Sequence, residues 1–197
     1  MIAFVKGNIV EKHPTYVVVE AAGLGYHLHI SLFTYTKIEA LEEVKLLTHL
    51  HVKEDSHTLY GFAEELERKL FRYLISVSGI GPSTAQVMLS SLHPEEIRLA
   101  IVNENIDQFQ RIKGIGKKTA QRIILDLKDK MSKEPEGSVP DISRPNNNTK
   151  KEEALSALVA LGFNRLQAQK VLNKLMQDQP ELEKVEDLIK IALRYLS

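Results

Sequence analysis

Two short segments of the chain, Ser78–Gln86 and Lys113–Gln121, each contain a Gly-Ile-Gly triplet directly before a predicted helix. Glycine permits a positive φ and leaves neighbouring amides uncovered by a Cβ atom. The unpaired amides of the helix start, together with the positive end of the helix dipole, favour a bound oxyanion. The tandem repeat therefore predicts two helical hairpins that hold phosphate groups. The predicted phosphate-binding residues are Gly79, Ile80, Gly81, Ser83 and Thr84 in the first hairpin, and Gly114, Ile115, Gly116, Lys117, Lys118, Thr119 and Arg122 in the second.

The second hairpin carries most of the positive charge. Lys117 and Lys118 occupy the first two positions of its helix, where the dipole disfavours cations unless an anion is bound. A dinucleotide-binding loop does not fit, because Thr119 stands in place of the third glycine of GxGxxG. Pro82 and Ser83 occupy the equivalent positions of the first hairpin, so we expect the second to contribute more affinity. The alternative is a packing motif whose lysines are merely solvated.

The pattern resembles the helix-hairpin-helix family of motifs, tandem copies of which grip the DNA backbone from the minor-groove side. Contacts of this kind position a protein on DNA without reading the base sequence. We therefore expect sequence-independent DNA binding that weakens steeply as salt is added.

Composition limits the function classes that remain. The 197 residues include no cysteine, which excludes disulfides and cysteine-ligated metal sites. No apolar run is long enough to span a bilayer and no signal-like N-terminus is present, so we expect a soluble, cytoplasmic protein. The net charge is zero, but residues 1–63 hold five Lys and Arg against seven Asp and Glu, whereas residues 64–133 hold twelve against nine. Positive charge is thus concentrated around the two hairpins.

The order of predicted elements indicates a multidomain α+β protein. Residues 1–63 contain about five strand-like segments, with Gly7-Asn8 and Gly23-Leu24-Gly25 as predicted turns, which favours an OB-type β-barrel. Residues 64–133 form the predicted tandem helix-hairpin-helix domain, and residues 134–150 a flexible linker. The predicted strands are Ile2–Val5, Tyr16–Val19, Tyr26–Ile30, Val44–Val52 and Leu59–Phe62.

Residues 151–197 are predicted to form a three-helix module. The expected helices span Glu152–Leu161, with Gly162 as C-cap, Arg165–Met176 and Val185–Leu196. The loop Leu161-Gly162-Phe163 resembles that of ubiquitin-associated modules, which favours a role for these three residues in binding a partner protein. The alternative is a passive C-terminal cap.

The succession of barrel, tandem hairpins, linker and three-helix module resembles the bacterial RuvA family over essentially the whole chain. The segments that carry the resemblance include Gly23-Leu24-Gly25-Tyr26, Leu59-Tyr60-Gly61-Phe62 and Gly114–Ala120. The resemblance implies a homotetramer, or an octamer of two tetramers face to face, that binds four-way (Holliday) DNA junctions and holds them open. Ser83 departs from the family pattern, in which a lysine is common at this position.

The resemblance also implies partners and a cellular role. The C-terminal module would recruit RuvB, a hexameric ATPase that drives branch migration, and a RuvC-type resolvase is a further partner. The chain would serve DNA recombination, DNA repair and the SOS response to DNA damage. It would be a non-catalytic subunit of an ATP-dependent helicase complex, with no cofactor and no metal of its own.

Glu54 and Asp55 lie in a predicted turn between two strands. A solvated acidic tip is the simplest interpretation. In the RuvA family, however, such tips converge at the crossover as an acidic pin, where carboxylates repel phosphates and keep the strands apart. The resemblance therefore assigns this role to Glu54 and Asp55.

Several other functions remain open from the residues alone. The chain could be a nonspecific duplex-binding adaptor, or a metal-dependent junction nuclease in which Glu54 and Asp55 bind Mg²⁺. The barrel could bind single strands by stacking, although it is short of suitable aromatics. The strand histidines could hold a metal, but the polar face of a half-buried strand explains them more simply. The candidates are Tyr16, Tyr26, Phe33 and Tyr35 for stacking and the pairs His27 with His29 and His49 with His51 for metal binding.

Overall fold

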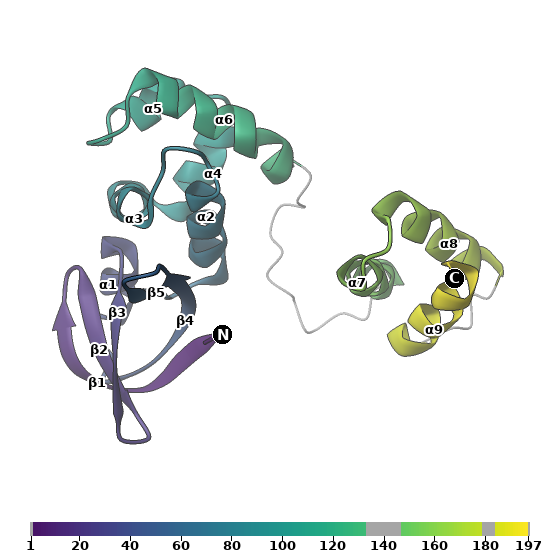
Figure 1. The fold of residues 1–197 in the computed structure, drawn as a ribbon, viewed down its shortest axis with the longest axis horizontal. Coiled ribbons are helices and arrows are strands. Elements are labelled where there is room, and N and C mark those ends of the chain that lie inside the picture. The colour runs from purple at the N-terminus through teal and green to yellow at the C-terminus, as the bar shows by residue number, and fades with distance from the viewer. Residues whose placement is uncertain (1, 133–146, 179–183, 197) are drawn as a thin grey trace. The chain divides into compact units, whose positions relative to one another are not determined.

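The computed structural model describes residues 2–132, 147–178 and 184–196, which form two compact units (Figure 1). One lies within residues 1–136 and contains the β-barrel and helices α1–α6; the other lies within residues 137–197 and contains α7–α9. The predicted barrel and hairpin domains thus belong to one compact unit. Residues 134–146 of the predicted linker lie outside the described residues.

The barrel is built from five strands in the closed order β1-β2-β3-β5-β4, which confirms the predicted OB-type architecture. The strands are β1 (Phe4–His13), β2 (Tyr16–Ala21), β3 (Leu24–His29), β4 (Glu43–Val52) and β5 (His57–Phe62). Neighbours are antiparallel except β3 and β5, which are parallel. Alternate side chains point inward and fill the barrel, as period-2 patterning requires. The inward set includes Val5, Val17, Val19, Leu28, Val44, Leu46 and Leu59.

Strand β1 runs through Gly7-Asn8, so the prediction of a turn there was wrong. A Cβ atom on Gly7 would lie 1.9 Å from the carbonyl oxygen of Glu20, so only glycine permits the close approach of β1 and β2. The strand continues through an irregularity between Ile9 and Glu11. Bulges of this kind bend a strand and help a sheet to close.

Helix α1 (Leu32–Ile38), between β3 and β4, was not predicted. Its N-terminus is capped by Ser31, whose hydroxyl accepts from the amide of Thr34. At its C-terminal end, the Lys12 ammonium donates to the carbonyls of Ile38 at 3.0 Å, Glu39 and Leu41. Part of what holds this short helix in place therefore comes from a residue 26 positions away in the sequence.

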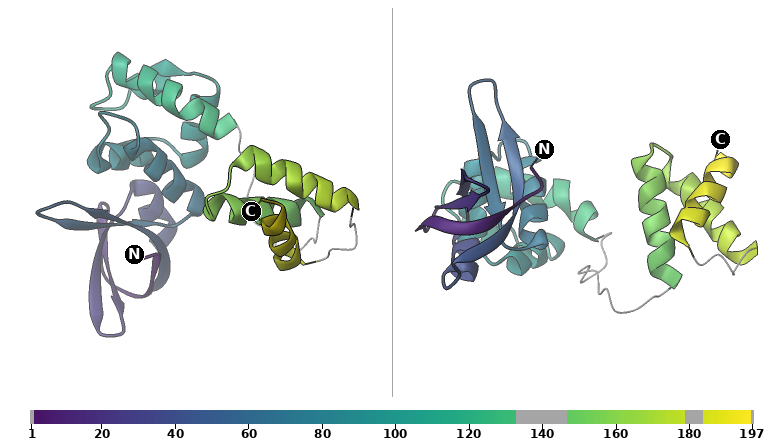
Figure 2. Two further views of the ribbon diagram at one scale, coloured as in Figure 1. Left: turned by 45° about the vertical axis from the view of Figure 1, so that its right-hand side comes forward. Right: turned by 90° about the horizontal axis from the view of Figure 1, so that it is seen from below.

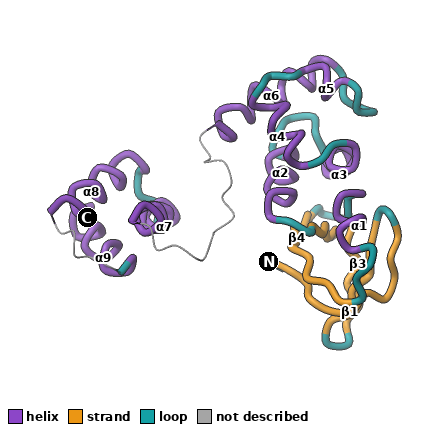
Figure 3. The backbone as a smooth tube through the Cα atoms, turned by 180° about the vertical axis from the view of Figure 1, so that it is seen from behind, coloured by secondary structure: helices purple, strands orange, loops and turns teal. Residues whose placement is uncertain are grey.

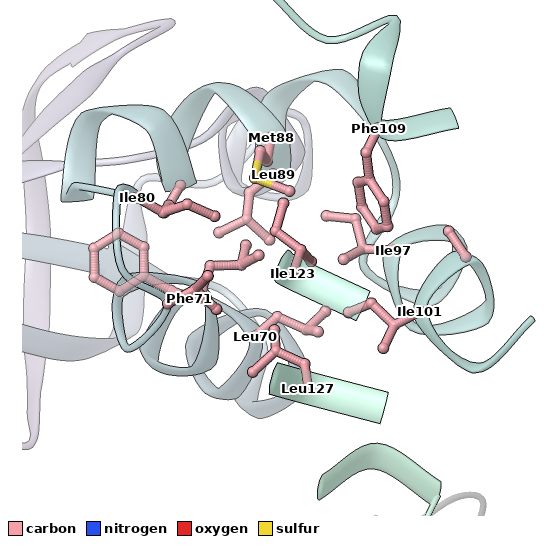
Figure 4. Packing of buried hydrophobic residues seen from close by; sticks show 14 of the residues in the cluster. Leu70, Phe71, Ile80, Met88, Leu89, Ile97, Ile101, Phe109, Ile123 and Leu127 are labelled. Carbon is pink, nitrogen blue, oxygen red and sulfur yellow. The ribbon is translucent and has the colours of Figure 1, made fainter. Parts of the chain in front are cut away.

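The helical part comprises α2 (Glu65–Ile75), α3 (Pro82–Ser91), α4 (Pro94–Val102), α5 (Ile106–Gln110) and α6 (Lys117–Ser132). These helices share one core (Figure 4) with Tyr60 and Phe62 of β5, whose rings lie 4.8 and 5.0 Å from that of Phe71. The barrel therefore supports α2, the helix that leads into the first hairpin. The fully buried residues of this core include Leu70, Phe71, Met88, Leu89, Ile97, Ile101, Phe109, Ile123 and Leu127.

A buried carboxylate also connects the barrel to α2. Glu67 accepts hydrogen bonds from the hydroxyls of Ser31 and Thr34, and its Oε2 accepts from the amide of Ala63 at 3.3 Å. Burial raises the pKa of Glu67 to about 7, and the three donors oppose that rise. The start of α1 and the start of α2 are thereby held to one another through a single side chain.

The second unit is a three-helix bundle made of α7 (Asn147–Ala160), α8 (Arg165–Asp178) and α9 (Val185–Leu196) (Figure 3). Its core contains Ala154, Leu158, Ala168, Leu172, Leu188 and Ala192. Helix α7 begins at Asn147 rather than Glu152, so the last four residues of the predicted linker are helical. No helix among the described residues has the length and apolar character needed to cross a membrane.

Candidate nucleic-acid interface

The first Gly-Ile-Gly segment forms the loop between α2 and α3, residues 76–81; we call this loop, together with the first turn of α3, hairpin 1. The amide of Val77 donates to Leu74 at 3.1 Å, and that of Ile80 donates to Val77 at 3.0 Å. Gly79 has a φ of 92°, in the left-handed region that glycine adopts without strain. Gly81 is the N-cap of α3, and its carbonyl accepts from Ala85 at 3.0 Å.

The loop between α5 and α6, residues 111–116, repeats these three hydrogen bonds; we call this loop, together with the first turn of α6, hairpin 2. Ile112 donates to Phe109 at 3.0 Å and Ile115 donates to Ile112 at 3.1 Å. Gly114 has a φ of 90°, and the carbonyl of Gly116 accepts from Ala120 at 2.9 Å. The repeated sequence thus forms a repeated structure, and the predicted tandem of helical hairpins is confirmed.

The isoleucine of each Gly-Ile-Gly triplet fixes its hairpin to the helical core. The side chains of Ile80 and Ile115 are each only 5% exposed and belong to the helical core. Their amides already donate to carbonyls inside the hairpins. Of the residues predicted to contact phosphate, these two therefore position the hairpins, and their neighbours remain as the groups that a ligand can reach.

The amides around each isoleucine are left without acceptors. Within the described residues, no protein carbonyl or side chain accepts from four amides of hairpin 1 and its helix, or from five of hairpin 2 and its helix. Unpaired amides at a helix start need water or a ligand, and grouped in this way they suit a phosphate. These amides belong to Gly79, Gly81, Ser83 and Thr84, and to Gly114, Gly116, Lys117, Lys118 and Thr119.

The second glycine of each triplet faces open space. A Cβ atom added to Gly81 or Gly116 would have no protein atom within 4 Å, and neither residue has a positive φ. The fold itself therefore does not require glycine at these two positions. An external group that approaches the backbone closely would require it.

Charge distinguishes the two hairpins. The side chains of Lys117 and Lys118 are exposed and form no ion pair with any described residue. In hairpin 1 the corresponding places hold Pro82, which has no amide hydrogen to donate, and the exposed Ser83. Uncompensated cations at a helix N-terminus oppose the dipole, and a bound anion would remove that penalty.

Arg122 joins the two hairpins, a contact that the sequence did not reveal. Its Nη1 donates to the carbonyl of Ser78 in hairpin 1 at 3.1 Å, across 44 residues of sequence. A guanidinium has five N–H donors, so others remain for a phosphate. The only sequence signal for this contact is the repeat itself, because tandem hairpins that share one core must lie close together.

The acidic turn is the tip of the β4–β5 hairpin, which projects from the barrel in Figure 2. The amide of Lys53 donates to Ser56 at 2.8 Å and closes the turn. Glu54 and Asp55 are exposed, and Ser56 Oγ donates to Asp55 Oδ1 at 3.2 Å. The predicted placement of both carboxylates at a hairpin tip is therefore correct.

The strand histidines lie on the outside of the barrel in ring contact with one another, and the half-buried His49 also contacts the Phe71 ring of α2 at 5.4 Å. The rings of His27 and His29 lie 5.0 Å apart and those of His49 and His51 lie 6.4 Å apart. In the part of the chain that the structure describes, no three His, Cys, Asp or Glu side chains are grouped so that they could hold a metal ion.

In the C-terminal unit, the predicted partner-binding loop ends α7. Gly162, with a φ of 94°, donates to Val159 at 3.0 Å, and Phe163 donates to Leu158 at 3.1 Å, which is a Schellman cap. Phe163 packs against the module's core, whereas Leu161 is 61% exposed. Leu166, near the start of α8, is a second exposed apolar side chain, 70% accessible, and was not predicted.

Comparisons with known proteins agree with this architecture. The chain matches the family models for the RuvA N terminal domain over residues 1–61, a SAM-like helix-hairpin-helix tandem over residues 71–129, and the RuvA C-terminal domain over residues 149–197.

Three relatives are each named Holliday junction branch migration complex subunit RuvA. Over 196 residues, and 100% of both chains, the identity is 56% with the protein of Christiangramia forsetii and 50% with that of Flavobacterium psychrophilum. Over 198 residues it is 47% with the protein of Cytophaga hutchinsonii, covering 98% of this chain and 99% of the relative. Identity of this degree over the full length shows that the chain belongs to the RuvA family.

Proposed function

We propose that this chain binds four-way DNA junctions as the non-catalytic subunit of a branch migration complex. The observation that carries the proposal is the pair of matching hairpins, each with unpaired amides at a helix start. The relatives named as Holliday junction branch migration complex subunits support the same function. Branch migration serves DNA recombination and repair.

The hairpins act as two phosphate clamps. The unpaired amides at the glycines and helix starts donate to the DNA backbone, and Lys117 and Lys118 add charge at hairpin 2. Ser83 and Thr84 supply hydroxyls at hairpin 1, where no lysine is present. Because these contacts are to the backbone, the protein selects the shape of its DNA rather than the sequence.

Junction shape is selected by symmetry. Four copies of the chain around a fourfold axis would present one pair of hairpins to each arm of a junction, and two such tetramers would enclose it. In each copy, the basic excess of residues 64–133 is modest, with twelve Lys and Arg against nine Asp and Glu, so several copies bound at once supply the affinity. A homotetramer, alone or paired as an octamer, is therefore part of the proposal.

The tip residues Glu54 and Asp55 act as an acidic pin. Carboxylates that converge at the crossover repel phosphates and so keep the exchanging strands apart. We expect the double substitution Glu54→Ala with Asp55→Ala to bind junctions as tightly as the wild type or more tightly, with an altered rate of branch migration. Unchanged affinity together with an unchanged rate would refute this role.

The C-terminal module recruits the ATPase that drives branch migration. Leu161 and Leu166 are exposed apolar side chains beside the turn at Gly162, exposed apolar groups suit a protein partner, and the partner we propose is the RuvB ATPase. A RuvC-type resolvase would act on the same bound junction. The complex would act on DNA in the cytoplasm.

A competition assay tests the function directly. A synthetic four-way junction and a linear duplex of the same arm sequences would compete for the protein at one fixed salt concentration. Strong preference for the junction supports the proposal, and stimulation by RuvB is then the next measurement. Equal binding would leave the hairpins as phosphate clamps but would indicate a nonspecific duplex-binding adaptor.

A further inference from the structure

Hairpin 1 has no charged side chain of its own. Residues 73–94, which contain this hairpin and the whole of α3, include no Lys, Arg, Asp or Glu. In the sequence repeat, residues 108–125 around hairpin 2 match residues 73–90, and they include five Lys and Arg and no Asp or Glu. Hairpin 1 therefore binds a phosphate through neutral amides and hydroxyls alone, unless another part of the chain supplies charge.

The side chain of Arg122 brings a positive charge to hairpin 1. This side chain is exposed, and its Nη1 donates to the carbonyl oxygen of Ser78 at 3.1 Å. Asp126 lies one turn further along α6, at the usual spacing for an ion pair on a helix. The structure describes both residues, and no ion pair joins them. The guanidinium is thus directed across to hairpin 1 and not along its own helix.

The peptide group between Ser78 and Gly79 connects this contact to an amide that a ligand can reach. The described residues include no cis peptide bond, and in a planar trans peptide the C=O and N–H groups point in opposite directions. Because the carbonyl of Ser78 points toward Arg122, the amide of Gly79 points away from it. No described protein group accepts from that amide, and a Cβ atom built on Gly79 would meet no atom within 4 Å.

A charged donor on the carbonyl also changes the strength of the amide. Hydrogen bonds polarise one another along a chain, and bonds from ionised donors are the strong ones. The guanidinium of Arg122 draws electron density toward the carbonyl oxygen of Ser78, which leaves the amide hydrogen of Gly79 more positive. The contact therefore fixes the direction of this amide and makes it a better donor to a phosphate.

The repeat contains no equivalent contact in the other direction. Val87 of α3 occupies the position that matches Arg122, and its side chain has no hydrogen-bond donor. Hairpin 2 has Lys117 and Lys118 beside its own amides, whereas hairpin 1 has Pro82 and Ser83 at these positions. The contact thus brings charge to the hairpin that lacks it.

We propose that Arg122 is a positioning residue for hairpin 1, which orients and polarises the Gly79 amide through the carbonyl of Ser78 so that this amide donates to a DNA phosphate. The role rests on the proposed function and deepens it, because it assigns a basic residue of the second repeat to the phosphate clamp of the first. The competing interpretation is that Arg122 acts only as a phosphate contact of hairpin 2.

Nuclear magnetic resonance of the full chain, labelled with 15N-glycine, tests the peptide contact without DNA. The ten glycines give one backbone amide signal each. We expect Arg122→Gln to shift the Gly79 signal, because the shorter side chain cannot reach the Ser78 carbonyl. Lys118→Gln is the matched control, since it removes the same charge one turn earlier in α6 and should leave the Gly79 signal in place. An unchanged Gly79 signal in a folded Arg122→Gln variant, as judged by thermal unfolding, would overturn the proposal.

Junction affinity then identifies the hairpin through which Arg122 acts. Arg122→Gln should weaken binding by about fivefold, as the loss of one hydrogen bond predicts. Combined with Gly81→Ala in hairpin 1, the loss should be smaller than the product of the two single losses by about twofold or more, because both changes impair one clamp. Combined with Gly116→Ala in hairpin 2, the two losses should multiply.

The opposite pattern of losses would also overturn the proposal and would make Arg122 a phosphate contact of hairpin 2. Losses that multiply with both glycine variants would overturn it as well, because Arg122 would then act through neither clamp. Failure of the proposed function is a separate result: if junction and linear duplex bind equally, the same variants are compared on the duplex. The Gly79 signal is measured without DNA and does not depend on that result.

Discussion

Hairpins 1 and 2 follow the same backbone path up to the second glycine and diverge at the helix that follows. The matching φ values of Gly79 and Gly114, and the matching hydrogen bonds of Ile80 and Ile115, differ by no more than a few degrees or about a tenth of an ångström. Hairpin 1 then presents Pro82 and Ser83, with Gly81 as its helix N-cap, whereas hairpin 2 presents Lys117 and Lys118. One scaffold thus supplies a nearly neutral clamp and a basic one.

This difference separates two contributions to DNA binding that are usually mixed. Unpaired amides fix the position of a phosphate through directional hydrogen bonds, and both hairpins supply them. Lysine charge adds affinity through counterion release, and hairpin 2 supplies it. The molecule therefore contains its own control, because a change made at one hairpin can be repeated at the other.

The largest expected effect comes from removing the charge of hairpin 2. Lys117→Ala with Lys118→Ala should weaken junction binding by about tenfold or more and lower the slope of log affinity against log salt by about 2. Ser83→Ala, the corresponding change at hairpin 1, should leave that slope unchanged. Binding measured at several salt concentrations distinguishes the two. Equal slopes for all three proteins would show that the lysines do not contact phosphate.

Alanine at the second glycine tests the amide contribution at both hairpins. A Cβ atom on Gly81 or Gly116 meets no protein atom, so each substitution should leave the unfolding temperature nearly unchanged. Each should nevertheless weaken junction binding severalfold, because the methyl group would meet the approaching phosphate backbone. Gly79→Ala and Gly114→Ala differ, since their positive φ predicts a loss of stability of about 1–2 kcal/mol. Tight DNA binding by Gly81→Ala and Gly116→Ala would remove the argument for close approach.

The hairpins could be predicted because the residues that determine each one are close together in the sequence. Two glycines, a buried isoleucine and a helix start lie within nine residues, and the repeat supplies an internal check. The contact between Arg122 and Ser78 spans 44 residues and depends on how the two hairpins pack, so no local pattern records it. Helix α1 was not predicted for a related reason, because the Lys12 ammonium that holds its C-terminal end comes from strand β1, far away in the sequence.

Gly7 shows a different limit of prediction from sequence. A glycine in a turn and a glycine that allows two strands to approach look alike in the sequence, and only the 1.9 Å distance to the Glu20 carbonyl separates them. The stacking of Tyr16 on His27 could not be predicted for the same reason. The alternation of His27 and His29 marks an outward strand face, but the contact with Tyr16 depends on the register of β2 and β3.

Hairpin 1 can also be given the charge that it lacks. Ser83→Lys places an exposed cation beside the amides of hairpin 1, at the position matching Lys118. We expect junction affinity to rise about fivefold and the salt slope to steepen by about 1, as one added phosphate contact predicts. Ser91→Lys, an exposed serine at the other end of the same helix, is the control for net charge. If both variants gain affinity equally, overall charge and not the clamp is responsible.

The smallest expected effect on DNA binding concerns the support beneath hairpin 1. Glu67 lies near the start of α2, and its pKa in the folded protein, about 7, exceeds the ordinary value of 4.5. The folded state therefore binds the proton of Glu67 more tightly, so the contribution of Glu67 to stability is greatest below about pH 4.5 and falls as pH rises toward 7. Glu67→Gln cannot titrate and should lose this fall, although the amide also weakens the contacts with Ser31 and Thr34 at every pH.

Denaturant unfolding at about pH 5 and pH 8 should show the variant losing less stability between the two than the wild type does. Glu39→Gln, at an exposed position after α1 where no ion pair of the side chain would be lost, should behave like the wild type. Junction affinity at neutral pH should change less than about twofold in either variant, because Glu67 supports the helix and does not touch the clamp.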